Sequence, residues 1–373
     1  MKKKIAVLGA TGSIGKSSLD VISRGRDDFD VVLLSAYTSR RELDELKKQW
    51  SSAVCVLSGE SGGKEKLKDA IKNSSADITI NGISGGAGLE PSLAAIESGS
   101  NLALANKETV VMAGKLVFAM AKGKNVNIIP VDSEHSAIFH LLKAHAGQGE
   151  KDGDDLISEI ILTASGGPFR KLSLKEMENV TVRDALAHPT WKMGKKITID
   201  SASMANKGLE IIEACCFFNT RPEKIKVVIH PQSVVHSMIR LRNGVIYAQL
   251  SKPDMRYPIH DALYWPETSS LNLEALSFDS LSLEFEKPDL EKFPMLSLAR
   301  EAAGHGGLYT CAYNAANEEA VRAFLEERIR FTDIPGITAS VLEKDWAADY
   351  GNVQAVLDAD TRARSLAVSY IGR

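Results

Sequence analysis

Over the first 131 residues, short apolar runs alternate with segments in which apolar residues recur every three or four positions. Each run is short enough for one strand, and the runs occupy residues 4–10, 29–37, 77–83, 101–106 and 125–131. Helical spacing lies between them, at residues 13–25, 39–50 and 107–124. Strands that alternate with helices in this way predict a doubly wound, Rossmann-like parallel sheet.

The pattern changes after residue 131. The stretch "LISEIILTASGGPF" predicts a strand that ends in a glycine-rich loop, and "VVIHPQSVVHSMIRLRNGVIYAQL" predicts a hairpin turning at Asn243-Gly244. Helical spacing dominates the C-terminal segment, where Thr332 and Asp360 are candidate N-caps. We therefore expect an N-terminal α/β domain at 1–131, a central α+β domain at 132–267, a linker or strand-like tie at 268–293 and a helical bundle at 294–373.

Composition excludes several classes of protein. The chain has 373 residues, 44% of them hydrophobic, and a net charge of −3, so it offers no basic surface for nucleic acid. No apolar run approaches the roughly 20 residues of a membrane span, and none is expected to cross a membrane. The four cysteines form neither a metal-ligand nor a disulfide pattern, which favours a reducing, cytoplasmic location.

Three glycines follow the first predicted strand. Gly9, Gly12 and Gly15 stand in "LGATGSIG", directly before a predicted helix. Glycines let the backbone approach a pyrophosphate, and a helix N-terminus offers N–H groups to it. The loop therefore indicates dinucleotide binding, with an ordinary tight turn as the alternative.

The end of the second predicted strand bears on the choice of dinucleotide. Ser39, Arg40 and Arg41 come there before the first acid, Glu42. An acid would suit the ribose hydroxyl of NAD, whereas arginine suits the 2′-phosphate of NADP. The segment favours NADP(H), although two arginines at a helix start are also compatible with simple solvation.

Two carboxylates, Asp132 and Glu134, follow the fifth predicted strand with only Ser133 between them. Like charges so close together repel, so either a bound cation or a solvated loop must compensate them. Glu210, on a predicted helix, would complete an all-oxygen site of the kind that suits Mg²⁺ or Mn²⁺. The alternative for Glu210 is a solvated helix face.

Two further loops suit a phosphate group. Ser165 precedes two glycines, whose N–H groups can form an anion nest. Ser201, Asn206 and Lys207 stand just before or at the start of a predicted helix and bring a hydroxyl, an amide and an ammonium. Ordinary helix capping is the alternative. Lys107, at the end of the fourth predicted strand, is a candidate for the same substrate.

The segment "AHPTWKMGKK" places Trp191 in a polar loop. A lid that closes over a ligand would explain an exposed tryptophan, and packing into a neighbouring core is the alternative. His230, His236 and His260 lack metal-ligand spacing and are expected to be packed.

Nine strings run in order along nearly the whole chain: "GATGSIG", "LANKE", "PVDSEH", "SGGPF", "HPTWKMG", "DSASMANKGLE", "HPQSVVHS", "PDMR" and "NAANE". Together they resemble the 1-deoxy-D-xylulose 5-phosphate reductoisomerase family. The resemblance implies an NADPH-binding N-terminal domain, a catalytic domain with a mobile lid and a homodimer. It also implies conversion of 1-deoxy-D-xylulose 5-phosphate to 2-C-methyl-D-erythritol 4-phosphate for non-mevalonate isoprenoid synthesis, with Mg²⁺, Mn²⁺ or Co²⁺.

The resemblance also assigns residues by their positions in the matching strings. Metal ligands are Asp132, Glu134 and Glu210. Catalytic residues are Lys107, Ser133, Glu134, His188, Trp191 and Met193. Substrate contacts are Lys107, Ser133, Glu134, Ser165, His188, Ser201, Asn206, Lys207 and Glu210. NADPH contacts are Thr11, Gly12, Ser13, Ile14, Asn106, Glu108 and Gly194.

One departure from the family concerns the adenosine phosphate. Many members carry a G-x-N-like turn after the second strand, where this chain has Tyr37-Thr38-Ser39. Ser39 and Arg40 are the candidates for that contact here. Two rival functions stay open: a semialdehyde-type dehydrogenase, which would need a nucleophilic cysteine, and a non-catalytic NADP sensor.

Overall fold

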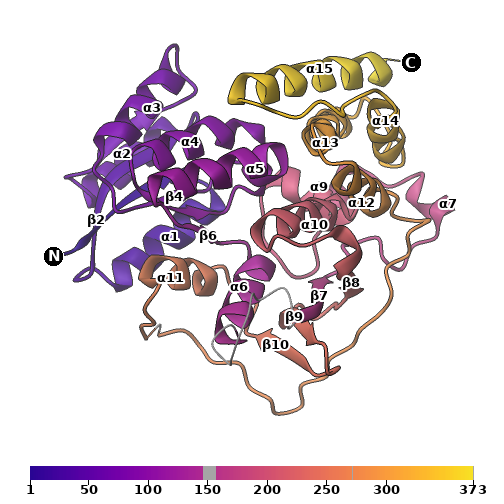
Figure 1. Ribbon diagram of the computed structural model, residues 1–373, viewed down its shortest axis with the longest axis horizontal. Helices are drawn as coiled ribbons and strands as arrows, with labels where there is room; N and C mark the ends of the chain where they lie inside the picture. The colour runs from indigo at the N-terminus through magenta and orange to yellow at the C-terminus, as the bar shows by residue number, and fades with distance from the viewer. Residues whose placement is uncertain (146–156, 271, 373) are drawn as a thin grey trace. The chain divides into compact units, whose positions relative to one another are not determined.

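A computed structural model describes residues 1–145, 157–270 and 272–372 (Figure 1). These residues form two compact units. The first comprises Met1–Thr109, Lys115–Ser136 and Asp254–Leu273, and the second comprises Val110–Gly114, Ala137–Pro253 and Glu274–Arg373.

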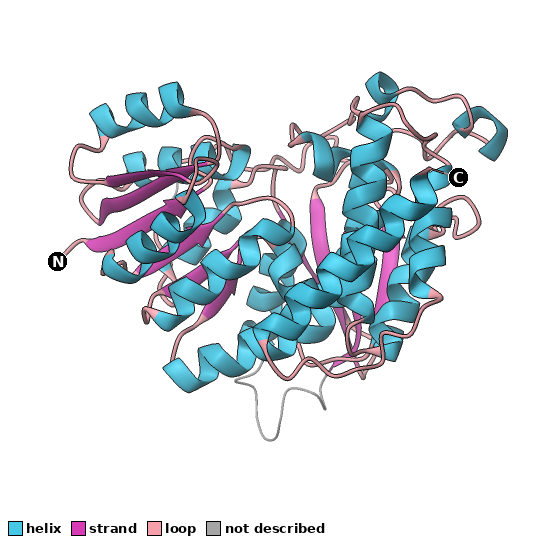
Figure 2. Cartoon of the chain, turned by 90° about the horizontal axis from the view of Figure 1, so that it is seen from above, coloured by secondary structure: helices cyan, strands magenta, loops and turns pink. Residues whose placement is uncertain are grey.

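The first unit is built on a parallel six-stranded sheet in the order β3-β2-β1-β4-β5-β6. Its strands are β1 (Lys3–Leu8), β2 (Phe29–Ala36), β3 (Val54–Leu57), β4 (Ile78–Asn81), β5 (Asn101–Leu104) and β6 (Ile128–Pro130). Its helices are α1 (Ser13–Arg24), α2 (Arg40–Gln49), α3 (Gly63–Asn73), η1 (Gly86–Gly88), α4 (Leu89–Glu97), most of α5 (Lys107–Lys124) and α11 (Arg256–Tyr264). Helices cover both faces of this sheet (Figure 2), so most of its strand residues are apolar and buried, and the predicted doubly wound fold is confirmed.

The strand order reverses between β1 and β4. In a parallel sheet all carboxyl ends lie on one edge, and ligands bind in the crevice where the order reverses. The loops after β1, β2, β5 and β6 therefore share that edge. These loops carry the glycine segment, Ser39, Asn106 and Asp132.

Residues Asp254–Leu273 pack with the first unit, although the sequence predicted a central domain up to residue 267. The physical reason is the packing of α11 on α1, β5 and β6. Arg256 also binds Asp20 of α1 at 2.9 Å and Asp254 through its other nitrogens. The packing boundary thus differs from the predicted one, and the limits of the functional domains stay a prediction.

The second unit contains a four-stranded sheet in the order β10-β9-β7-β8. Its strands are β7 (Ile157–Ala164), β8 (Ile225–Ile229), β9 (Val235–Leu241) and β10 (Ile246–Leu250). The hairpin of β9 and β10 turns at the predicted Asn243-Gly244, where Gly244 has a φ of +88°. Ile229 and Glu286 exchange two backbone hydrogen bonds of 2.9 Å. Residue 286, in the segment predicted as a linker or strand-like tie, is therefore hydrogen-bonded to β8.

Helices fill the rest of the second unit. They are most of α6 (Ser133–His145), α7 (Leu174–Met177), α8 (Val182–Ala185), α9 (Lys195–Ala202), α10 (Ala205–Phe217), η3 (Pro222–Lys224), α12 (Met295–His305), α13 (Tyr309–Leu325), α14 (Asp333–Leu342) and α15 (Val353–Ile371). Helix α10 packs on α12, and a Cβ at Gly208 would lie 2.7 Å from the Ala299 Cβ and 2.6 Å from the Tyr313 hydroxyl. Only glycine allows this approach.

Two local predictions need correction. Asp360 lies inside α15, which begins after Asn352, whose side chain accepts from the Ala355 N–H. The acidic stretch after β6 is not a loop, because α6 begins at Ser133, only three residues after the strand. Thr332 does stand at the N-cap of α14, although its side chain makes no capping bond.

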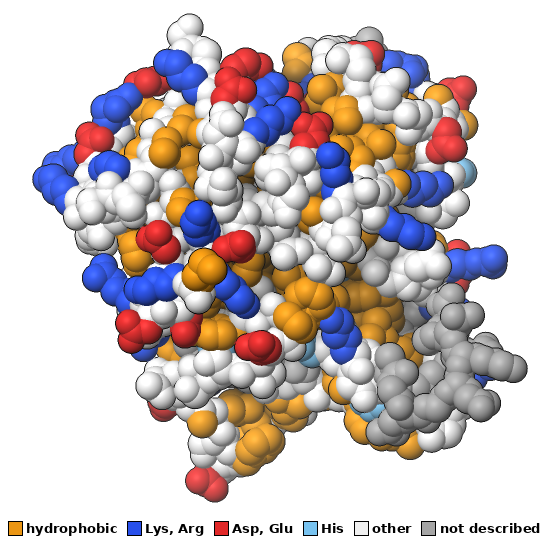
Figure 3. Space-filling view, turned by 60° about the vertical axis from the view of Figure 1, so that its left-hand side comes forward, with side chains coloured by type: hydrophobic (Ala, Val, Ile, Leu, Met, Phe, Trp, Pro, Cys, Tyr) orange, Lys and Arg blue, Asp and Glu red, His pale blue; other side chains and the backbone are white. Residues whose placement is uncertain are grey.

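The surface carries mixed charge. On the face in Figure 3, Lys and Arg side chains are interspersed with Asp and Glu, in keeping with the small net charge. Among the described residues, every helix is too short or too polar to cross a lipid bilayer.

We predict that Gly208→Ala lowers the free energy of unfolding by about 1–3 kcal/mol, because the added methyl group overpacks α10 against α12 and α13. Gly336→Ala is the matched control. Gly336 lies on α14 with open space around it, so this change should stabilise the protein by about 0.5–1 kcal/mol. Denaturant unfolding followed by circular dichroism measures both, and similar values for the two variants would contradict the packing.

Candidate functional site

The glycine loop after β1 is shaped for close backbone approach. Gly9 has a φ of +75°, and a Cβ there would lie 2.9 Å from the Gly82 carbonyl oxygen. A Cβ at Gly15 would lie 2.4 Å from the Gly9 oxygen, which keeps the start of α1 against the loop. Gly12 begins α1 without a side-chain cap, and the first turn holds no acid. The first-turn N–H groups, including those of Ser13 and Ile14, are therefore suited to an anion.

The loop after β2 gives mixed support for the predicted phosphate contacts. Ser39 is the N-cap residue of α2 and makes no side-chain capping bond. Arg40 is exposed and forms an ion pair with Glu60, which follows β3. An exposed ion pair of this kind is weak, so Arg40 can exchange Glu60 for another anion.

Asn106, predicted as a cofactor contact, braces a neighbouring loop. Its Nδ2 donates to the carbonyl oxygens of Ile83 at 2.7 Å and Gly85 at 2.9 Å, and to Glu108 at 2.9 Å. Its Oδ1 accepts from the backbone and hydroxyl of Thr109. The side chain thus holds the loop after β4 at the carboxyl edge of the sheet.

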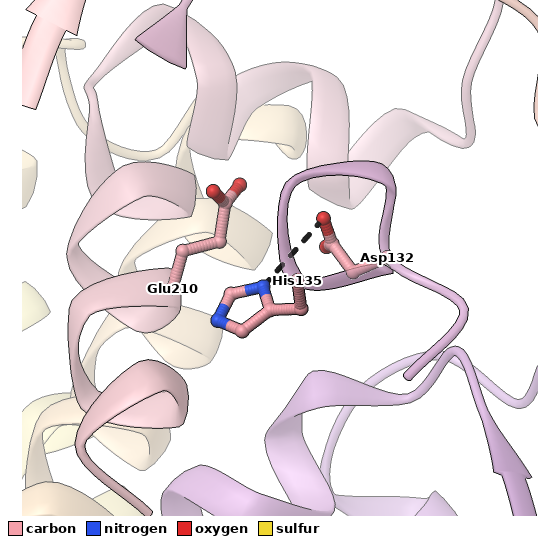
Figure 4. Close-up of side chains that lie close together, drawn as sticks. All are labelled: Asp132, His135 and Glu210. Carbon is pink, nitrogen blue, oxygen red and sulfur yellow. Dashed lines mark ion pairs between the residues drawn. The ribbon is translucent and has the colours of Figure 1, made fainter. Parts of the chain in front are cut away.

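The acidic stretch after β6 contains a buried ion pair. Lys107, at the start of α5, pairs with Asp132, and both side chains are largely buried. His135 is fully buried, and its Nδ1 lies 3.9 Å from Asp132 Oδ1 (Figure 4). Burial raises the pKa of the Asp132 carboxyl, but Lys107 and His135 more than offset it, so the net pKa lies well below its usual value. Asp132 is therefore ionised at neutral pH.

The neighbouring Glu134 is part of the first turn of α6. Its Oε2 accepts from the Ser133 hydroxyl at 2.6 Å. Its N–H lies 3.4 Å from Asp132 Oδ1, so Asp132 also caps the helix. Two carboxylates and one imidazole thus come from four consecutive residues. His135 is a buried neighbour of Asp132 that the site predicted from the sequence left out, although its position three residues after Asp132 was the available signal.

Glu210 projects from α10 in the second unit (Figure 4) and is fully buried. The Asn206 amide donates to Glu210 Oε1 at 2.6 Å, and Lys207 forms an ion pair with Oε2. The solvated helix face considered from the sequence is therefore wrong. Glu213, one turn further along α10, is fully buried as well.

Ser165, His188 and Ser201 form a cluster in the second unit. His188 Nε2 lies 3.1 Å from each serine hydroxyl. His188 Nδ1 accepts the backbone N–H groups of Thr190 and Trp191 at 3.1 and 2.9 Å. Since Nδ1 is an acceptor, the neutral ring carries its proton on Nε2 and presents it to the serines. Burial lowers the pKa of His188, which favours this neutral form.

The glycine loop beside this cluster admits no side chains. Gly166 and Gly167 have φ values of +82° and +66°, and a Cβ at Gly167 would lie 2.7 Å from the Ser201 carbonyl oxygen. The Gly167 N–H points to Ser165 Oγ at 3.3 Å. The loop and α9 thus meet at backbone distance, and the anion nest stays a prediction.

Residues 187–194 are a loop, and α9 begins directly after Gly194. Trp191 and Met193 are half-buried, and the Trp191 ring lies 6.4 Å from that of His236. Trp191 is thus neither fully packed nor fully exposed. His230 is packed as predicted: its ring accepts from the Val234 and Val235 N–H groups.

The cysteines bear on the dehydrogenase rival. Burial raises the pKa of Cys215 to about 12, and burial raises that of Cys311 further. A thiol that stays protonated at neutral pH is a poor nucleophile. These two cysteines do not supply the activated thiol that a semialdehyde-type dehydrogenase needs.

A nucleotide-type glycine loop, a buried ionised carboxylate at Asp132 and a serine–histidine cluster are typical of an α/β enzyme of the dinucleotide-binding class. Comparison with known families makes this specific. The family described as 1-deoxy-D-xylulose 5-phosphate reductoisomerase matches residues 5–62 and 58–114. Its C-terminal domain matches residues 128–218, and a DXP reductoisomerase C-terminal domain matches residues 250–366.

Individual members of this family are similar to the chain over nearly its full length. The 1-deoxy-D-xylulose 5-phosphate reductoisomerase of Treponema denticola is 47% identical, over 99% of this chain and 97% of its own length. The solved reductoisomerase of Zymomonas mobilis, in complex with NADPH, superposes with a TM-score of 0.90 at 40% identity, covering 100% of this chain and 99% of that one. A DOX-P reductoisomerase solved with NADPH, fosmidomycin and magnesium has a TM-score of 0.87 at 37% identity, covering 99% of this chain and 98% of that one. The chain belongs to the 1-deoxy-D-xylulose 5-phosphate reductoisomerase family, which confirms the resemblance found in the sequence.

Proposed function

We propose that this chain converts 1-deoxy-D-xylulose 5-phosphate to 2-C-methyl-D-erythritol 4-phosphate with NADPH and a divalent cation, a step of non-mevalonate isoprenoid synthesis. The observation that carries the proposal is 47% identity to a reductoisomerase along 99% of the chain. The non-catalytic sensor is less favoured, because a sensor has no use for a buried ionised carboxylate at Asp132 or for a phosphate-type cluster of two serines and a histidine.

The first unit supplies the nucleotide site. The glycine loop and the uncapped start of α1 fit a pyrophosphate, because a Cβ at Gly9 would meet the Gly82 backbone. NADPH bound there would supply the hydride. The proposed contacts in this unit are Thr11, Gly12, Ser13, Ile14, Ser39, Arg40, Asn106 and Glu108. Gly194, of the second unit, is a further proposed contact.

The donor set fits a hard cation. Asp132, Glu134 and Glu210 offer carboxylate oxygens only, and such ligands suit Mg²⁺ or Mn²⁺. Asp132 is held ionised by Lys107, and Glu210 is paired with Lys207. A cation bound by these three residues would polarise the oxygens of the substrate as a Lewis acid.

The second unit supplies the phosphate site. Ser165, Ser201 and His188 offer hydrogen-bonding groups, and His188 Nε2 lies 3.1 Å from each serine hydroxyl. Asn206 and Lys207 add an amide and an ammonium from the start of α10. Holding the phosphate gives binding energy that orients the reacting end of the substrate. Trp191 and Met193 are proposed to exclude water from that end.

Lys107 and Ser133 complete the proposed machinery. Lys107 keeps the Asp132 carboxylate charged, and Ser133, beside Glu134, is proposed to meet the hydroxyl groups of the substrate. A cytoplasmic location stays a prediction. It is supported because no disulfide joins the cysteines at the described positions 55, 215, 216 and 311.

The exposed edge of the second sheet supports a homodimer. β10 is the edge strand, and its apolar residues Ile246 and Tyr247 are 43% and 41% exposed, beside Val245 at 45%. An apolar edge strand is a ready template for pairing with another chain. We infer that a second copy covers it.

Activity is tested by the loss of NADPH absorbance with 1-deoxy-D-xylulose 5-phosphate, before and after chelation and re-addition of Mg²⁺. The wild type should be active only with metal. Glu210→Gln keeps the side-chain size but removes the charge, so kcat should fall by at least about a hundredfold while NADPH affinity stays within about twofold.

Glu159→Gln is the matched control, since Glu159 pairs with Arg240 on the sheet of the same unit. Its kcat should match the wild type. A Glu210→Gln enzyme with normal turnover would remove Glu210 from the metal site, and an inactive wild type would refute the proposed function.

The dimer is tested by light scattering. The wild type should have twice the mass of the chain, and Ile246→Lys should shift it toward the monomer, because a buried charge opposes edge pairing. Leu174→Lys, at an exposed residue of α7, makes the same change elsewhere and should leave the dimer intact. A monomeric wild type, or a dimeric Ile246→Lys variant, would contradict this pairing.

A further inference from the structure

The "NAANE" segment has no part in the site described so far. Its Asn317, on α13, is fully buried and donates from Nδ2 to Asp200 Oδ1 at 2.8 Å. Asp200 lies on α9 and is 1% exposed. Lys196, one turn earlier on α9, places its ammonium 2.8 Å from Asp200 Oδ2. Both carboxylate oxygens thus have a partner, and all three residues belong to the second unit.

Burying a carboxylate is costly unless strong partners replace its water. Here one partner comes from the same helix and the other from α13, which packs on α9. The Asn317 hydrogen bond joins Asp200 to α13 and so limits how α9 can rotate about its axis against α13, while Lys196 holds the Asp200 carboxylate from within α9. A helix held only by apolar contacts could rotate about its axis more easily.

The orientation of α9 matters because Ser201 directly follows Asp200 on this helix. Its hydroxyl lies 3.1 Å from His188 Nε2, and a hydrogen bond of that kind tolerates only a small displacement. On another side of α9, the Ser201 carbonyl oxygen meets the Gly167 backbone at a distance that admits no Cβ. α9 is therefore held between the glycine loop and α13.

We propose that Asp200 is a positioning residue for the phosphate-binding cluster. Bound by Lys196 and Asn317, it fixes α9 so that the Ser201 hydroxyl is aimed at the phosphate group of the substrate. Helix α13 of the C-terminal region thereby contributes to substrate affinity without touching the substrate. This inference rests on the proposed function of the same cluster.

The direct test is Asp200→Asn, which keeps the shape but removes the charge that faces Lys196. The KM for 1-deoxy-D-xylulose 5-phosphate should rise about tenfold, the effect of losing one well-aligned hydrogen bond to a charged group. The KM for NADPH and kcat should stay within about twofold. Inhibition by inorganic phosphate should weaken in parallel with substrate binding.

The route through Ser201 is tested by a double-mutant cycle. In a Ser201→Ala background, Asp200→Asn should raise the KM by less than about twofold more, because both changes remove the same contact. Asp360→Asn is the matched control: Asp360, on α15, binds Arg364 at 2.7 and 2.9 Å in the same unit. It should lower the melting temperature but leave the KM unchanged.

An unchanged KM and phosphate inhibition in Asp200→Asn would overturn the proposal. So would full additivity with Ser201→Ala, or an equal rise in the KM for NADPH, since either points to general loosening. If Asp200→Asn does not fold, Asn317→Ala replaces it, with a several-fold rise in KM expected and no rise overturning the proposal. Calorimetric titration of inorganic phosphate into each variant tests the inference even if the wild type proves inactive.

Discussion

The proposed metal chemistry depends on buried carboxylates that each lie against a lysine. An isolated carboxylate removed from water takes up a proton rather than stay charged. Lys107 prevents this at Asp132, and Lys207 lies against Glu210 in the same way. The two residues of each pair belong to the same unit. Lys107 and Asp132 both follow strands at the carboxyl edge of the parallel sheet, whereas Lys207 and Glu210 lie three positions apart on α10. In each pair a carboxylate is thereby held in place by a lysine of its own unit.

The two units divide the chemistry. The first unit offers a glycine loop and the carboxyl edge of a parallel sheet, where the strand order reverses. The second offers hydroxyl, imidazole and ammonium groups on loops and helix starts. The neutral His188 illustrates how local structure sets this chemistry, because two backbone N–H groups of its own loop fix which nitrogen carries the proton. The C-terminal helices also matter, since α12 and α13 support the helices that carry Ser201 and Lys207.

Much of this could be predicted from the sequence, for identifiable reasons. Parallel strands covered on both faces are short apolar runs, and Asn243-Gly244 is a strong hairpin signal, so these elements were found. Asp360 was assigned wrongly because an acid inside a helix resembles an acid at its start. The burial of Glu210 could not be predicted, because Asn206, Glu210 and Glu213 share one side of α10 and this spacing resembles a solvated helix face. The packing of α10 against other elements of the second unit buries that side. His135 and Asp200 were missed because only the folded structure shows their neighbours: Asp132 for His135, and Lys196 and Asn317 for Asp200. In the sequence each resembles an ordinary polar residue.

The central claim is that Asp132 and Glu210 bind the same divalent cation. The most direct measurement is calorimetric titration of Mn²⁺ into the wild type, Asp132→Asn and Glu210→Gln, each with NADPH present. The account predicts one site in the wild type and an affinity weaker by at least about tenfold in either variant. Unchanged Mn²⁺ affinity in either variant would contradict a shared site. So would two independent Mn²⁺ sites in the wild type, if each variant removed only one of them.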